Sequence, residues 1–146
     1  MLNPSTYWLI MFVVVAYAYG RGKVDERLAA SICAIGSIAT VLVRSPGSPY
    51  YANVETGVLT IDFVALAAFV LLALRSKRFW PLWVAGFQLT SVLAHFLKAV
   101  HWNMIPEVYA AAERFWIYPI FLAIVVGTWR SRRRWLSEES HQAQPA

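Results

Sequence analysis

The sequence predicts an all-α protein, a bundle of five transmembrane helices that forms a single domain. Of its 146 residues, 59% are hydrophobic and 14% are charged, whereas a soluble domain carries about 25% charged residues. The apolar residues come in long runs rather than at the spaced positions of amphipathic helices. Lysine and arginine lie at the ends of these runs, as in membrane proteins. The net charge of +5 therefore gives no reason to expect a nucleic-acid partner.

The first two predicted spans cover residues 5–20 and 28–43. We interpret the first as a retained helix rather than a cleaved signal peptide, because the opening MLNPSTYW carries no basic residue. The second span has small residues four positions apart, which lets helix backbones approach closely in lipid. We expect it in the middle of the bundle, with a homodimer face as the alternative. The small pairs are Ala30 and Ala34, Cys33 and Ser37, and Gly36 and Thr40.

The other three predicted spans cover residues 58–74, 81–102 and 106–129. The short basic turn RSKRFWP joins the third and fourth spans, so these should be antiparallel neighbours. The fifth span is long, and we expect Pro119 to kink it because proline removes a backbone donor. Residues 136–146 are polar and are expected to form a disordered tail.

The distribution of basic residues predicts the orientation of the bundle. With five spans, ten lysines and arginines fall on one side of the membrane and three on the other. Positive residues favour the cytoplasmic side, so we expect the N-terminus outside and the C-terminus in the cytoplasm. The three on the outer side are Arg44, Lys98 and Arg114.

Three of the ionisable residues inside the predicted spans form the candidate site, namely Asp62, His95 and Lys98. Asp62 and His95 are almost equally far from the turn between the third and fourth spans, so they should reach the same depth. Charged groups at membrane depth are costly and are often functional. The three could form an outer-side pocket for a ligand or a proton relay. The alternative is that the carboxylate and its partners simply fix helix packing, and this is the interpretation that we favour from the sequence.

A second group of polar residues could form a rim around that pocket. The candidate rim residues are Arg44, His101, Glu107 and Arg114.

We expect no metal site, because His95 and His101 are six residues apart and so lie on different helix faces. A haem held by two histidines of one chain is not expected either, since His141 falls in the cytoplasmic tail. Gln88 and Thr90 are interpreted as hydrogen-bond partners between helices rather than catalytic groups.

The segments YYANVETGVLTIDF, LRSKRFWPLWVAGFQLTSVLAH and GTWRSRRR resemble a set of small polytopic inner-membrane proteins of alphaproteobacteria. The resemblance implies an inner-membrane location and no particular activity. With no catalytic motif in the sequence, we expect a non-enzymatic accessory or self-associating subunit of a membrane complex. The alternatives are binding of a lipid-soluble ligand, such as a quinone-type cofactor, and proton-coupled transport at the outer pocket.

Overall fold

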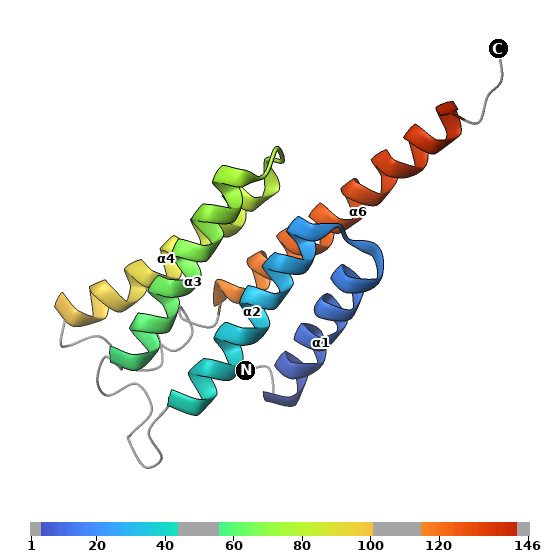
Figure 1. Cartoon of the computed structure of the whole chain (residues 1–146). Coiled ribbons are helices and arrows are strands. Elements are labelled where there is room, and N and C mark those ends of the chain that lie inside the picture. Colours follow the sequence, from blue (N-terminus) through green and yellow to red (C-terminus); the bar gives the residue numbers. More distant parts are fainter. Residues whose placement is uncertain (1–3, 44–55, 101–114, 143–146) are drawn as a thin grey trace.

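The computed structural model describes residues 4–43, 56–100 and 115–142, and no strand occurs in these ranges (Figure 1). The all-α prediction is therefore confirmed for the described part of the chain. The five helices are α1 (Pro4–Arg21), α2 (Val24–Val43), α3 (Thr56–Arg75), α4 (Trp80–Val100) and α6 (Ile117–Gln142).

The helices close into a ring in which α1 packs on α2, α2 on α3, α3 on α4, α4 on α6, and α6 returns to α1. α2 also contacts α6 across the ring, so it has three neighbours. The large buried side chains at the centre include Phe69, Ile120 and Ile124. The small residues of α2 allow this close packing, since Ala29, Ala30 and Cys33 are all buried.

α2 begins four residues earlier than the predicted span, and its charged first turn explains the difference. The carboxylate of Glu26 accepts a hydrogen bond of 2.9 Å from the backbone N–H of Lys23. This contact satisfies a donor that the start of a helix leaves unpaired. Gly22 precedes this cap, and a Cβ atom there would lie 2.4 Å from the carbonyl oxygen of Ala18. The tight turn between α1 and α2 therefore requires glycine.

Two predictions about the last helix differ from the structure. The expected continuous helix over residues 106–129 is interrupted by a turn at Trp116, and α6 begins at Ile117. Pro119 thus lies in the first turn of a helix, where its missing N–H leaves no bond unmade. Further along, the predicted disordered tail from residue 136 is wrong as far as Gln142, because α6 continues to that residue. Most of residues 106–116 and all of 143–146 lie outside the described residues.

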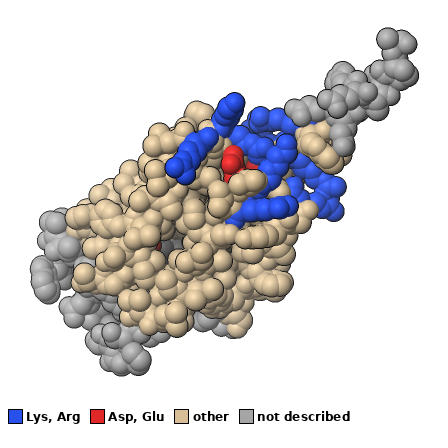
Figure 2. All heavy atoms as spheres, viewed as in Figure 1, with Lys and Arg blue, Asp and Glu red and all other residues tan. Residues whose placement is uncertain are grey.

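Basic side chains gather at one end of the molecule, where α6 projects past the other helices (Figure 2). This end is formed by the α1–α2 turn, the α3–α4 turn and the continuation of α6. These are the three segments whose charges the sequence placed on one side of a membrane. The opposite end holds the C-terminal ends of α2 and α4 and the N-terminal ends of α1, α3 and α6.

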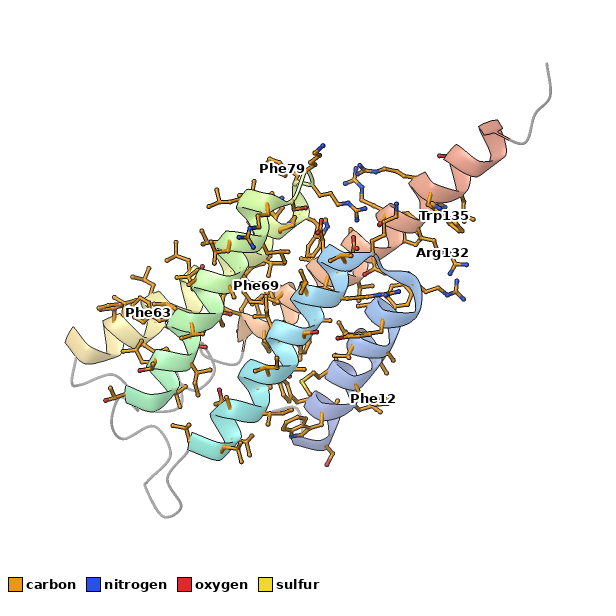
Figure 3. All side chains as sticks on the ribbon, in the orientation of Figure 1. Phe12, Phe63, Phe69, Phe79, Arg132 and Trp135 are labelled. Carbon is orange, nitrogen blue, oxygen red and sulfur yellow. The ribbon has the colours of Figure 1, made fainter. Side chains whose placement is uncertain are left out.

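Two of the described helices, α2 and α3, are long and apolar enough to cross a membrane. Only 22% of the residues in the apolar window of each are buried inside the bundle. Large apolar side chains point outward on other helices too, as Phe12 does on α1 (Figure 3). Leu42, Leu74 and Phe12 are more than 70% exposed.

Candidate functional site

Asp62 on α3 and His95 on α4 are in direct contact. The Nε2 atom of His95 lies 2.9 Å from the Oδ2 atom of Asp62, which is hydrogen-bonding distance. The His95 side chain is 2% exposed and that of Asp62 is 19% exposed. The predicted pairing of these residues across the α3–α4 hairpin is confirmed, and the pair lies in the half of the bundle away from the basic end.

Two further side chains of α4 complete the surroundings of the Asp62 carboxylate. The amide nitrogen of Gln88 donates to Oδ1 of Asp62 at 3.1 Å, and the hydroxyl of Ser91 donates to Oδ2 at 3.4 Å. Gln88, Ser91 and His95 are buried. They follow one another at intervals of three and four residues, so one face of α4 presents all three to α3. All three neighbours can therefore donate hydrogen bonds to the Asp62 carboxylate at the same time.

The Asp62 carboxylate forms part of the wall of a cavity of about 340 Å³ that lies between the helices, in the half of the bundle away from the basic end. All five described helices, together with Trp116 in the turn before α6, contribute to its lining. Protein interiors have few voids larger than a water molecule, whereas ligand pockets begin at about 300 Å³. The polar residues of the lining are Tyr7, Cys33, Ser37, Thr40, Asp62, Gln88 and Ser91, and its larger aromatic residues are Trp8, Phe69, Trp116 and Tyr118.

A second polar pair lies on another part of the cavity lining, between α1 and α2. The hydroxyl of Tyr7 lies 2.6 Å from the Oγ atom of Ser37, whose own proton is directed at the carbonyl oxygen of Cys33 at 2.8 Å. Tyr7 is therefore the donor of the shorter bond. The lining combines these polar groups with apolar and aromatic side chains, as expected of a pocket for a mostly apolar ligand.

Several of the predicted site residues cannot be placed. The backbone of Lys98 belongs to α4, but its side chain is outside the described residues, and so is that of His141 on α6. The proposed contact between Lys98 and Asp62 therefore stays a prediction. The four candidate rim residues, Arg44, His101, Glu107 and Arg114, all lie outside the described ranges.

Of the two predicted hydrogen-bond partners between helices, one is confirmed and one is wrong. Gln88 bonds to Asp62 on α3, whereas the hydroxyl of Thr90 donates to the carbonyl oxygen of Gly86 on its own helix at 3.0 Å. Thr90 is two residues after Gln88, so the two point to different sides of α4. Within the described ranges, no three histidine, cysteine, aspartate or glutamate side chains are grouped as metal ligands would be.

Sequence reasoning missed most of the cavity. Ser91 could have been identified from the sequence as a site residue, because it shares a face of α4 with Gln88 and His95. Ser37 was interpreted only as a small packing residue, and Tyr7 was not among the candidate site residues. Neither has a local pattern that indicates a cavity, since the cavity exists only once α1, α2 and α6 come together.

Comparisons of the chain with protein-family models, with curated proteins and with solved structures found no match. A fold of this kind can also host many functions. The function must therefore be argued from the cavity and its residues.

Proposed function

We propose that this chain is a multi-pass membrane protein whose helix ring binds a small lipid-soluble molecule in this cavity. The observation that carries the proposal is the Asp62 carboxylate, which is held by three donors in the wall of an otherwise largely apolar cavity. Polar groups inside a membrane bundle are costly and usually face a functional cavity. If Asp62 and His95 only fixed helix packing, a tightly packed seam between α3 and α4 would serve equally well.

Two of the described helices are long and apolar enough to cross a membrane, and we propose that the chain crosses it five times. Exposed apolar side chains on α1, α4 and α6 support it, since soluble proteins rarely expose apolar patches beyond a few hundred Å². The gathering of basic residues at one end supports a cytoplasmic location of that end in an inner membrane. Reporter fusions at both termini and in the α1–α2 and α3–α4 turns test this topology. Active periplasmic reporters in either turn would contradict it.

The ligand part is tested by filling the cavity. Gly36 lines the cavity, and a Cβ atom there would have no heavy atom within 4 Å. Gly36→Leu should therefore occupy ligand space without disturbing the fold. Gly86→Leu is the matched control, because Gly86 is exposed on α4, lies outside the cavity lining and also has open space at its Cβ position. Each substitution should stabilise its own helix by up to about 1 kcal/mol, because leucine has a higher helix propensity than glycine.

The measurement is mass spectrometry of small molecules extracted from the purified protein. A compound that co-purifies with the wild-type chain and with Gly86→Leu, and is lost from Gly36→Leu, is the expected result. Equal amounts in all three samples would mean that the molecule binds to the outer surface. A complete absence of bound molecules from all of them, with no saturable binding of added compounds, would refute the proposal.

A role as an accessory subunit is the second candidate, and the projecting part of α6 favours it. Trp135 lies on the stretch of α6 that continues past the other helices (Figure 3). Trp135 and its neighbour Leu136 are both more than 45% exposed. Exposed apolar side chains beside basic residues suit a contact with a partner protein at the membrane surface. Co-purification in mild detergent, lost in Trp135→Ser with Leu136→Ser, is expected. A strictly monomeric wild-type particle would argue against this role.

A further inference from the structure

We infer that the ligand of this cavity is a lipophilic cation, such as an amine or a quaternary ammonium compound. This inference rests on the proposed function and names the chemical class that the cavity would select. It follows from the charge of the lining, from the remaining bonding capacity of Asp62, and from the aromatic side chains of the same lining.

The described lining of the cavity contains one carboxylate, that of Asp62, and no lysine or arginine. Gln88 and Ser91 are neutral donors, and the imidazole of His95 can donate in its neutral form. None of these contacts brings a lysine or arginine charge to Asp62. An anion facing a low-dielectric cavity attracts a cation far more strongly than it would in water.

Asp62 also keeps room for a ligand. A carboxylate accepts about four hydrogen bonds, and the three side-chain donors from α4 use three of these positions. The side chain is 19% exposed and belongs to the cavity lining. An ammonium group could therefore approach the carboxylate from the cavity without displacing His95.

The aromatic part of the lining suits the same class of ligand. Trp8, Trp116 and Tyr118 contribute to the cavity, and the Trp116 ring is stacked on that of Phe87 with 6.3 Å between ring centroids. Faces of tryptophan and tyrosine attract cations, and quaternary ammonium groups are recognised in this way. A neutral quinone would gain the apolar contacts but no charge attraction to Asp62.

The test uses two probes of the same shape that differ in charge. Benzyltrimethylammonium is a permanent cation, and neopentylbenzene is its neutral carbon counterpart. Binding of each to the full-length protein in detergent is measured by calorimetry, for the wild type and for Asp62→Asn. Asparagine keeps the size of Asp62 and one acceptor oxygen, and removes the charge. Partitioning into detergent is the same for both proteins and cancels in their comparison.

We expect the ratio of cation affinity to neutral affinity to fall about 30-fold or more in Asp62→Asn, as for the loss of a buried charge pair. An unchanged ratio would overturn the inference. Phenylmethanesulfonate, an anion of similar size, provides a comparison that needs no variant. It should show no saturable binding to the wild type, and binding as tight as that of the cation would also overturn the inference.

The outcomes separate this inference from the proposed function. If neopentylbenzene binds saturably to the wild type and not to Gly36→Leu, while the charge of the probe makes no difference, the cavity is a ligand site with another selectivity. If none of the probes binds saturably and the purified protein carries no small molecule, both the inference and the proposed function fail.

Discussion

The buried carboxylate of Glu26 is paired with the guanidinium of Arg78, which joins the first turn of α2 to the turn between α3 and α4. A second contact lies beside it, since the hydroxyl of Ser76 donates to Asp25 at 2.6 Å. Both contacts bridge more than 50 residues of sequence. They connect the two helix turns at the basic end of the bundle, opposite the half that contains the cavity.

Arg78→Ala should destabilise the bundle strongly, because it leaves the Glu26 carboxylate buried without its cation. Removing one partner of a buried ion pair costs about 3–5 kcal/mol. The free energy of unfolding of the purified protein, measured by denaturant titration in detergent, should fall by this order. Lys77→Ala is the control, since Lys77 is exposed in the same turn, and should change it by less than about 0.5 kcal/mol.

A double variant separates the buried charge from other effects of the same substitution. Glu26→Gln combined with Arg78→Ala removes the unpaired charge and should be more stable than Arg78→Ala alone. If the double variant were the less stable of the two, the loss would come from the contacts of the Arg78 stem rather than from the charge of Glu26.

The Glu26 pair shows a limit of sequence reasoning. Charged residues between two apolar runs indicate a loop, and the orientation rule needs only their position along the chain. Burial of Glu26 depends on a partner 52 residues away in another turn. No local pattern encodes such a contact, so the first turn of α2 was assigned to the loop.

The contact between Asp62 and His95 should be measurable as a coupling energy. In a double-mutant cycle of Asp62→Asn and His95→Ala, residues in direct contact couple by about 0.5–3 kcal/mol. The control cycle pairs Asp62→Asn with Thr90→Ala, because the Thr90 hydroxyl bonds within its own helix. Coupling in that cycle should be close to zero. Equal coupling in both cycles would mean that the substitutions act through a general change in α4.

This pair could be predicted because the geometry of a hairpin is simple. Two antiparallel helices rise by the same distance per residue, so residues equally far from the turn lie at the same depth. The cavity beside the pair could not be predicted in this way. It depends on how α6 completes the ring, and α6 starts at Ile117, after a turn at Trp116 that the sequence did not predict.

Adding even a single methyl group at Gly127 should destabilise the protein. A Cβ atom there would lie 2.7 Å from the Cδ2 atom of the Trp80 ring, at the contact between α6 and α4. Gly127→Ala forces the indole to move and should cost about 1–3 kcal/mol of unfolding free energy. Gly20→Ala is the control, because open space surrounds that Cβ position, and a gain of about 0.4–1 kcal/mol is expected. A stabilising effect at both positions would mean that the Trp80 ring repacks freely.

The hydroxyl of Tyr7 should contribute to stability more than that of Tyr19, although both make the same kind of contact. Each donates to a serine Oγ atom whose proton is directed at a backbone carbonyl one turn earlier, Ser37 for Tyr7 and Ser31 for Tyr19. The first pair is partly buried and the second is exposed, so water can replace only the second bond.

Tyr7→Phe should therefore lower the unfolding free energy by about 0.6 kcal/mol, the average for hydrogen bonds between membrane helices, and Tyr19→Phe by less. Adding Ser37→Ala to Tyr7→Phe should cost less than Ser37→Ala costs in the wild type, because the shared bond is already lost. Denaturant titration of these variants in one detergent provides the measurement. Fully additive effects at Tyr7 and Ser37 would show that the hydroxyl pair does not connect α1 to α2 in the folded protein.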